Sequence, residues 1–472
     1  MSKVLIYNTL TRQKEEITPS HPDGKIRMYE CGMTPYSDPH IGHARTAITF
    51  DNLKRWLEFR GMPVIHVRNV TDIEDKIIKR ANEQGIPCSD LVARFDAVRK
   101  DLFGKLNLIP PAFEPYATAV IPEIIAIVEK LLANGMAYVA EGDVYFRVRK
   151  FPGYGKLSRN AIEDLVSGSR VQACGLKEDQ LDFDLWKAAK PGEPNWDSPW
   201  GKGRPGWHIE CSAMSMKYLG ETLDIHGGAN DLIFPHHENE TAQSEGATGK
   251  PFVRYWVHSG FVTMNQEKMS KSVGNVIGLR EVVDRVPGPA LRLLMGQTHY
   301  RAPLEYSEAQ ERMARETWET LKRMLELNPG NAVKWLTPLP DLDGLEKMAK
   351  ENIASFDSFM DDDLSVPRAL AEIFDLGREF HKFVIGNMQM DSSSISRLQE
   401  IRKSIVDRLA VVGIEMGGTE AGAPTEVLAL VKAREEARKV KEWKKADDLR
   451  TAISALGWNI EDTPRGTVVR PN

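Results

Sequence analysis

The pattern of apolar and polar positions in the first 70 residues predicts strand, helix and strand. The segment 25–31 (KIRMYEC) is a short apolar run that precedes Gly32 and is typical of a strand. From Pro39 to Gly61, apolar positions recur about every 3.6 residues, which predicts a helix. The segment 63–70 (PVIHVRNV) predicts a buried strand. Strand, helix and strand so close together indicate a βαβ unit and therefore a parallel sheet.

The pattern changes several times further along the chain. Residues 137–148 (AYVAEGDVYFRV) predict a hairpin that turns at 141–143. The Pro- and Gly-rich segment 190–206 predicts a loop that ends an inserted domain, after which strands are expected at 222–226 and 253–261. From Ser307 to Val412 the pattern is helical. A flexible linker is expected at 415–424, followed by one charged helix at about 425–456.

Composition narrows the class of protein. A chain of 472 residues suits two to four domains, and 42% hydrophobic with 27% charged residues is ordinary for a globular protein. No run of about 18 apolar residues occurs, so no membrane span is expected. Four cysteines in so long a chain suit a reducing compartment, and the N-terminus lacks a secretory signal pattern. We therefore expect a cytoplasmic protein.

The first candidate for chemistry is His40-Ile41-Gly42-His43, which opens the predicted helix directly after a strand. His40 and His43 lie on one face of the first turn, where backbone N–H groups favour bound phosphate. Gly42 allows a phosphate or a flat ring to approach the backbone. Two imidazoles there can donate hydrogen bonds to a phosphorus centre under attack. The alternative is a helix start with two exposed histidines.

The second candidate is Lys268-Met269-Ser270-Lys271-Ser272, a cationic segment that is followed by Gly274. Lysines three residues apart can neutralise charge that builds up on a triphosphate. The alternative is a solvated loop, because lysine is usually found on the surface.

The third candidate is a dispersed set of metal ligands. Cys31 ends the first predicted strand, Cys211 lies in the string WHIEC, and Glu240 lies one helical turn after His236. Two thiolates, an imidazole and a carboxylate suit zinc. The spacing does not decide between His236 and His237. The alternative is two buried cysteines that pack as small apolar side chains.

These strings together resemble one known family. H-I-G-H near the N-terminus with K-M-S-K-S far downstream is similar to the class I aminoacyl-tRNA synthetases. The strings at 30–32 (ECG), 69–72 (NVTD), 206–214 (GWHIECSAM), 224–228 (DIHGG) and 234–240 (FPHHENE) narrow the resemblance to the cysteinyl-tRNA synthetase family. It extends from about Tyr7 to Thr467.

The resemblance implies a role for each matching residue. His40, Gly42, His43, Lys268 and Lys271 would bind ATP, and the two histidines and two lysines would be catalytic. One zinc ion per chain would be bound by Cys31, Cys211, His236 and Glu240, with His237 beside it, and Mg²⁺ would arrive with ATP. Residues that would contact the amino acid or adenosine are Gly32, Thr71, Trp207, His226 and Asp231.

The resemblance also implies a fold. We expect an α/β protein with a doubly wound, Rossmann-like parallel sheet, an inserted α/β domain, an all-α bundle and a small C-terminal domain. The expected divisions are a first catalytic half at 1–111, the inserted domain at 112–204, a second catalytic half at 205–306, the bundle at 307–414, the linker at 415–424 and an anticodon-binding domain at 425–472.

The implied activity is that of a cysteine–tRNA ligase. The partners would be ATP, L-cysteine and tRNA(Cys), with no membrane, and a monomer is expected. The net charge is −5, so tRNA would need a local basic face. Residues 431–450 are a candidate, and Trp443, Lys444 and Trp458 are expected to contact RNA, whereas the acidic run 361–363 is expected on a helix end away from it.

Two other functions share some of these motifs. A ligase of the mycothiol type would pass cysteine to an amino sugar, but such a small acceptor needs no long helical region. A catalytically silent paralogue could bind RNA or sense cysteine, although intact His40, His43, Lys268 and Lys271 disfavour it. The charged C-terminal helix could also be a solvated helix with ion pairs between successive turns.

Overall fold

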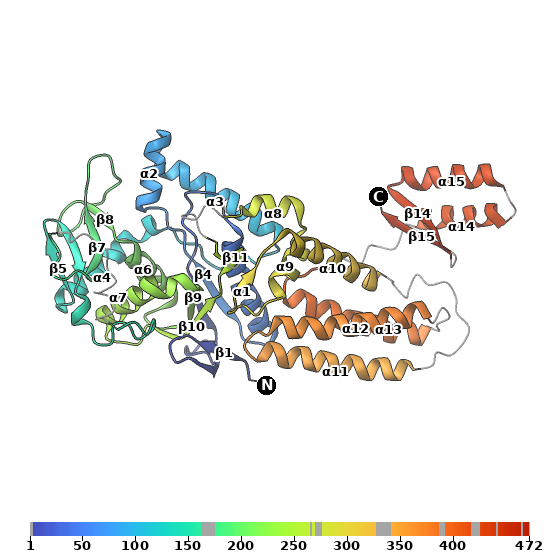
Figure 1. Cartoon of the computed structure of the whole chain (residues 1–472), viewed down its shortest axis with the longest axis horizontal. Coiled ribbons are helices and arrows are strands. Elements are labelled where there is room, and N and C mark those ends of the chain that lie inside the picture. The colour runs from blue at the N-terminus through green and yellow to red at the C-terminus, as the bar shows by residue number, and fades with distance from the viewer. Residues whose placement is uncertain are drawn as a thin grey trace.

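The structure is a computed structural model that describes residues 3–161, 175–264, 267–269, 276–326, 341–386, 392–416, 425–439, 442–463 and 466–471. Its centre is a four-stranded parallel sheet in the order β10-β9-β3-β4. The strands are β3 (Ile26–Glu30), β4 (Val64–Arg68), β9 (Leu223–Ala229) and β10 (Val253–Ser259). Helix α1 (Ile41–Phe59) connects β3 to β4, so the predicted βαβ unit is confirmed (Figure 1).

Helices and small sheets cover the two faces of the central sheet. The segment 1–111, predicted as the first catalytic half, also contains β1 (Leu5–Asn8), β2 (Gln13–Glu16), α2 (Asp75–Gln84) and α3 (Cys88–Lys105). The second half adds α6 (Trp207–Leu219), η3 (Asn230–Leu232), η4 (Ile233–His237), α7 (Glu238–Thr248), β11 (Val262–Met264), β12 (Glu267–Lys268), α8 (Leu279–Arg285), α9 (Gly288–Gly296) and β13 (Leu304–Glu305). Two large apolar clusters result, one around α1 and α9 and the other around α6 and α7.

A four-stranded antiparallel sheet, β5-β6-β7-β8, lies between the two catalytic halves in the sequence. This region comprises η1 (Ala117–Val120), α4 (Ile121–Ala133), β5 (Ala137–Ala140), β6 (Asp143–Phe146), η2 (Val148–Lys150), β7 (Phe183–Ala188) and β8 (Gly203–Pro205). The hairpin predicted at 137–148 is confirmed as β5 and β6. The expectation that 190–206 is entirely loop is wrong, because Gly203–Pro205 pairs with β7 at the edge of the sheet, where proline is tolerated.

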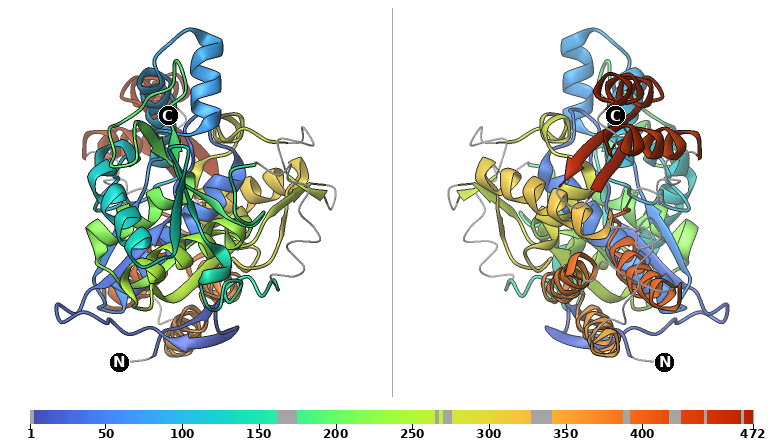
Figure 2. Two further views of the ribbon diagram at one scale, coloured as in Figure 1. Left: turned by 90° about the vertical axis from the view of Figure 1, so that its left-hand side faces the viewer. Right: turned by 90° about the vertical axis from the view of Figure 1, so that its right-hand side faces the viewer.

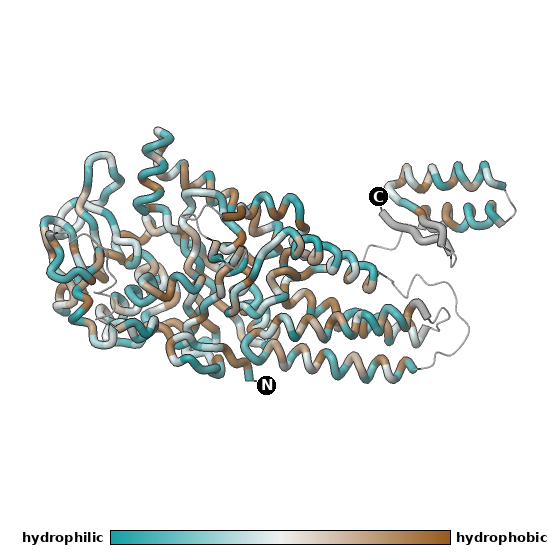
Figure 3. Tube along the Cα trace, viewed as in Figure 1, coloured by the Kyte–Doolittle hydropathy of each residue, from teal (hydrophilic) through white to brown (hydrophobic). Residues whose placement is uncertain are grey.

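The helical region after residue 307 is confirmed within the described ranges. It contains α10 (Glu308–Glu326), α11 (Leu342–Asp361), α12 (Val366–Gly386) and α13 (Ser392–Val411). Hydrophobic and hydrophilic positions alternate along these helices (Figure 3), as expected for helices that bury one face against their neighbours. Residues 327–340 and most of the expected linker at 415–424 lie outside the described residues.

The prediction of one helix at 425–456 is wrong. The chain forms two helices, α14 (Thr425–Lys439) and α15 (Trp443–Ala455), followed by a hairpin of β14 (Trp458–Thr463) and β15 (Gly466–Pro471). Val427, Val431, Ile453 and Ile460 form a small core in this unit. A single helix could not bring these positions together, so burial of the apolar side chains favours the folded-back arrangement. In Figures 1 and 2 these elements are drawn in red.

A buried carboxylate ties the N-terminus to the bundle. The acidic run 361–363 ends α11, as expected, and Asp363 there is fully buried. Its Oδ1 accepts hydrogen bonds from the backbone N–H of Tyr7 (2.9 Å) and the hydroxyl of Tyr300 (2.7 Å), and Arg301 Nε donates to Oδ2 (2.9 Å). Three segments that are distant in the sequence therefore meet at one side chain.

Replacing Asp363 by Asn should destabilise the protein by about 2 kcal/mol, because an amide cannot accept from all three donors. Asn tolerates the left-handed backbone of this position (φ 63°). The free energy of unfolding in urea measures the effect. The matched control is Asp362→Asn, which removes an exposed ion pair with Lys14 and should change stability by less than about 0.5 kcal/mol. Equal losses in the two variants would contradict the role given to Asp363.

Candidate functional site

Four potential metal ligands meet at the carboxyl edge of the sheet. Cys31 directly follows β3, Cys211 lies in α6, His236 lies in η4 and Glu240 lies in the first turn of α7. Their ligand atoms all lie within 4.8 Å of one another, and all four residues are buried. The backbone N–H of Cys31 donates to the carbonyl of Gly227 (3.0 Å), which fixes the end of β3 against β9. The residues that the sequence proposed as ligands are therefore brought together.

The spacing of the sulfur atoms fits a tetrahedral zinc site. Cys31 Sγ lies 3.9 Å from Cys211 Sγ and 3.7 Å from Glu240 Oε1. Two thiolates that share a tetrahedral zinc ion stand about 3.8 Å apart when each zinc–sulfur bond is about 2.3 Å. Two soft sulfur donors with one imidazole and one carboxylate are also a donor set that zinc accepts.

A second set of four residues overlaps the first. It consists of Cys31, His226, His237 and Glu240, and His237 Nε2 lies 3.4 Å from Cys31 Sγ. His226 Nδ1 donates to the carbonyl of Tyr29 (3.0 Å), and His237 Nδ1 shares a hydrogen bond with His258 Nε2 (2.8 Å). This set leaves out Cys211. The first set includes both thiols, which as thiolates would compensate the charge of a cation better. Because His236 belongs to that set and His237 does not, His236 is favoured as the ligand.

The charges of the predicted ligands depend on one another. A hydrogen bond from Cys31 and the proximity of His236 lower the pKa of Cys211 to about 6. Burial opposes protonation of His236, but Glu240 and Cys211 raise its pKa to about 10. Burial also disfavours ionised Glu240, but His226 and His236 lower its pKa to about 2. The thiolate of Cys211, the imidazolium of His236 and the carboxylate of Glu240 therefore stabilise one another, and a divalent cation would displace the proton of the imidazolium.

Further histidines orient the predicted ligands. His208 Nδ1 shares a hydrogen bond of 2.9 Å with His236 Nδ1, and His226 Nε2 lies 2.8 Å from Glu240 Oε2. His258 joins the hydroxyl of Thr9 to His237. Such partners fix the orientation of a ligating side chain. Our sequence analysis missed His208 and His258 as functional residues, although His258 lies near the carboxyl end of a predicted strand, where functional groups of such sheets gather.

The first turn of α1 is close-packed around its two histidines. The backbone N–H of His40 donates to His43 Nδ1 (3.1 Å), and the two rings are stacked with their centres 3.6 Å apart. A Cβ on Gly42 would lie 3.0 Å from the ring of His40 and 3.5 Å from the end of Met269. A side chain at position 42 would push the His40 ring away by a few tenths of an ångström, so glycine favours this close approach of ring to backbone.

The structure brings the two signature segments together. The N–H of Ile41 donates to the carbonyl of Ile277 (3.2 Å), and the N–H of Leu279 donates to the carbonyl of Pro39 (2.8 Å). Met269 is buried and contacts the start of α1. Lys268 lies in β12, which pairs with β11 at Thr263, but its side chain is outside the described atoms, and Lys271 lies outside the described residues. The role of the two lysines stays a prediction.

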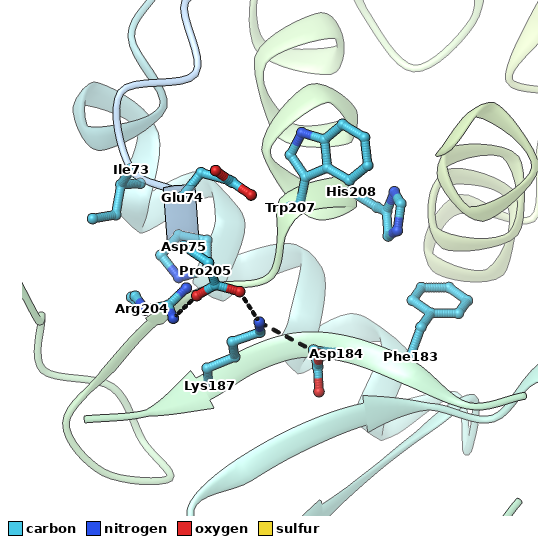
Figure 4. Close-up of a pocket in the computed structure, with 10 residues that line it drawn as sticks. All are labelled: Ile73, Glu74, Asp75, Phe183, Asp184, Lys187, Arg204, Pro205, Trp207 and His208. Carbon is cyan, nitrogen blue, oxygen red and sulfur yellow. Dashed lines mark hydrogen bonds and ion pairs between the residues drawn. The ribbon is translucent and has the colours of Figure 1, made fainter. Parts of the chain in front are cut away.

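A cavity of about 200 Å³ opens beside the ligand cluster (Figure 4). Trp207 and His208 at the start of α6 line it together with residues from α2, β7 and β8. The ring of Trp207 is partly exposed and its centre lies 4.4 Å from that of His236, so the cavity adjoins the cluster. This position is compatible with the predicted contact of Trp207 with a substrate.

The other predicted substrate residues lie around the same edge. Asn69 connects two of them: its Oδ1 accepts from the N–H of Gly32 (2.8 Å), and its Nδ2 donates to the hydroxyl of Thr71 (3.2 Å). His226 is buried behind Glu240, whereas Asp231 is exposed in η3. Contact of these residues with a substrate stays a prediction.

Comparisons with known proteins decide the family. The model for the tRNA synthetases class I (C) catalytic domain matches residues 17–316, and the model for the cysteinyl-tRNA ligase anticodon binding domain matches residues 420–470. The cysteine–tRNA ligase of Caldicellulosiruptor saccharolyticus is 46% identical over 469 residues, which cover 98% of this chain and 99% of that protein. The chain belongs to the cysteine–tRNA ligase family. The member from Azotobacter vinelandii is 45% identical and is matched over 98% of each chain.

Solved structures show the fold of the class. The methionyl-tRNA synthetase of Mycobacterium tuberculosis in complex with methionyl-adenylate has a TM-score of 0.59 at 15% identity, covering 83% of this chain and 90% of that one. A putative arginyl-tRNA synthetase from Campylobacter jejuni has a TM-score of 0.55 at 16% identity, covering 83% and 93%. These likenesses confirm the predicted Rossmann-like α/β fold. No helix in the described ranges is long and apolar enough to cross a membrane.

The C-terminal unit of this family member presents one aromatic side chain to solvent. Trp443 is 59% exposed at the start of α15, and Lys444 beside it is also exposed. Trp458 instead packs partly against the small core of the unit. Trp443 is therefore better placed than Trp458 for the predicted stacking on an RNA base.

Replacing Cys211 by Ser should abolish stoichiometric zinc binding, because a hydroxyl is a poor zinc ligand and the remaining set has one sulfur. Elemental analysis of the purified protein after dialysis measures the zinc content. The control is Cys88→Ser, which changes a half-buried thiol at the start of α3 and should leave the zinc content unchanged. A Cys211→Ser variant that retains one zinc per chain would contradict the proposed ligand set.

Proposed function

We propose that this protein activates L-cysteine with ATP to give cysteinyl-adenylate and pyrophosphate. It then transfers cysteine to the 3′-terminal adenosine of tRNA(Cys). The observation that carries the proposal is the meeting of three features at one edge of the sheet: the His40–His43 turn, the segment that follows the lysine motif, and the Cys-Cys-His-Glu cluster. Family membership supports the same function.

The first step is an attack by the carboxylate of cysteine on the α-phosphate of ATP. Such a displacement depends on positioning and on neutralisation of charge more than on a covalent intermediate. His40 and His43 lie at the N-terminus of α1, and we assign them to hydrogen bonds with the phosphates in the transition state. Lys268 and Lys271 would approach from the adjoining loop, and Mg²⁺ would accompany ATP.

We assign selection of the amino acid to the ligand cluster. Cysteine and serine differ only by sulfur for oxygen, which the shape of a pocket discriminates poorly. Zinc held by Cys31, Cys211, His236 and Glu240 would coordinate sulfur in preference to a hydroxyl oxygen. The buried histidines around Glu240 hold its carboxylate in place, and Trp207 adjoins the cluster on the side of the cavity.

We assign recognition of tRNA to the C-terminal unit, where Trp443 and Lys444 face solvent. That the protein works as a cytoplasmic monomer stays a prediction. Activation of cysteine is measured as ATP–pyrophosphate exchange and charging as label on tRNA, so the two steps are measurable separately.

The function is tested with labelled cysteine. Purified protein with ATP, Mg²⁺ and zinc is offered total tRNA in one reaction and an amino-sugar acceptor in another. Label should appear on tRNA, and the labelling should be lost when the cysteine anticodon is changed. Label on the sugar alone would identify a cysteine ligase with a small acceptor. If cysteine also fails to support ATP–pyrophosphate exchange, the proposed function is wrong.

Replacing Gly42 by Ala should lower the rate of cysteine-dependent ATP–pyrophosphate exchange by about tenfold or more, because the new methyl group displaces the ring of His40. Thermal stability should not fall in parallel, since alanine is favoured over glycine inside a helix by about 1 kcal/mol. The matched control is Gly104→Ala in α3, where a Cβ meets no atom within 4 Å and exchange should be unchanged. Normal exchange by the Gly42 variant would contradict this role.

A further inference from the structure

Two guanidinium groups converge on one aromatic ring at the edge of the catalytic domain. Arg80 in α2 and Arg94 in α3 both lie over the ring of Phe95, at 5.6 Å and 4.8 Å from its centre. Lys76, one turn before Arg80, has its ammonium 5.7 Å from the ring of Tyr36. Cation–π contacts hold these side chains in place, but they do not neutralise the charges.

Three cations of this surface have no ion-pair partner in the part of the chain that the structure describes. Within the described residues, no carboxylate lies at ion-pair distance from Lys76, Arg80 or Arg94. Lys79 reaches only Glu83, at 3.9 Å with both side chains exposed, which is worth little in water. We name Lys76, Lys79, Arg80 and Arg94 the α2–α3 basic face.

The neighbouring acidic groups are engaged elsewhere. Asp75 pairs with Lys187 and Arg204 of the inserted sheet, and buried Asp96 pairs with Arg99 and Lys100. Asp90 precedes Arg94 by one turn and accepts a hydrogen bond from Ser89, and Glu74 accepts one from the backbone N–H of Lys76; neither carboxylate pairs with a cation of this face. Cations that are held in place without ion-pair partners are available to an anionic ligand.

The position of the α2–α3 basic face indicates which part of an anionic ligand would reach it. Helix α2 begins at the cavity of Figure 4, where Ile73, Glu74 and Asp75 line one wall and Trp207 another. Thr71, predicted to contact the substrate, lies four residues before α2. In Figures 1 and 2, α2 stands at the outer edge of the molecule, so the face is open to a large ligand.

We propose that the α2–α3 basic face binds phosphates of the tRNA backbone close to its 3′ end. This inference rests on the proposed function, because a tRNA charged at this site must bring its terminal ribose to the adenylate. The nucleotides just before that ribose have to cross the rim of the cavity, where α2 begins. Lysine and arginine on an exposed helix hairpin contact phosphate without reading the sequence, so the face positions the acceptor end and does not select the tRNA.

The test removes charge and leaves a polar, uncharged side chain at each position. In the full-length protein, Lys76→Gln, Arg80→Gln and Arg94→Gln are combined, and charging of tRNA(Cys) is measured at several salt concentrations. KM for tRNA should rise by about tenfold, and the dependence of log KM on log salt should weaken by about one unit for each lost phosphate contact. Cysteine-dependent ATP–pyrophosphate exchange without tRNA should stay within about twofold of the unaltered protein, which shows that the variant is folded.

Two controls separate charge from other effects. Arg80→Lys with Arg94→Lys keeps the charge and should retain most of the affinity for tRNA. Lys347→Gln with Lys350→Gln removes two exposed charges from α11 and should leave KM for tRNA unchanged. An RNA that contains only the acceptor arm should lose affinity for the triple variant as strongly as full-length tRNA does.

The outcomes distinguish failure of this inference from failure of the proposed function. If the unaltered protein does not activate cysteine, the proposed function is wrong, whatever the basic face does. If it charges tRNA normally and the triple variant shows the same KM and the same salt dependence, the basic face does not bind the acceptor end. A loss of binding to full-length tRNA with unchanged binding to the acceptor arm would also overturn the inference, because it would place the contact elsewhere on the tRNA.

Discussion

The pairing of β3 with β9 is the constraint on which the site depends. These strands come from the two halves of the catalytic region, and they lie side by side with their carboxyl ends together. The chain leaves β3 towards α1 on one side, while the second half of the sheet continues from β9 on the other. A reversal of strand order of this kind leaves a crevice at the carboxyl ends. The His40–His43 turn and Cys31 follow β3, His236 and Glu240 follow β9, and Cys211 is supplied by α6, so the turn and the ligand cluster meet there.

The close approach of β9 to its other neighbour, β10, explains a glycine in β9. A Cβ on Gly227 would lie 1.7 Å from the carbonyl oxygen of Val257 on the neighbouring strand β10 and 3.1 Å from the ring of Phe50. Any side chain here would force the strands apart, and Cys31 would lose its hydrogen bond to the Gly227 carbonyl. Backbone packing therefore accounts for glycine at position 227.

Much of the fold could be predicted because its periodic signals are strong. The helix that starts at Ile41 and the strands around it follow clear 3.6-residue and apolar patterns. The C-terminal unit was mispredicted because a charged, helix-favouring sequence continues from Lys439 to Trp443 without glycine or proline. The ligand set was accessible through recognisable strings, but the choice between His236 and His237, and the roles of His208 and His258, depend on contacts between distant segments that no spacing reveals.

The wide separation of the predicted metal ligands has a consequence for the order of folding. Cys31 precedes the inserted sheet, whereas Cys211, His236 and Glu240 follow it. Closing so long a loop costs conformational entropy before any contact repays it, so contacts between such distant segments form slowly. During synthesis, Cys31 leaves the ribosome long before Cys211, His236 and Glu240 have been added to the chain. Completion of this cluster therefore requires that the segment after β3 has docked against the segments around β9.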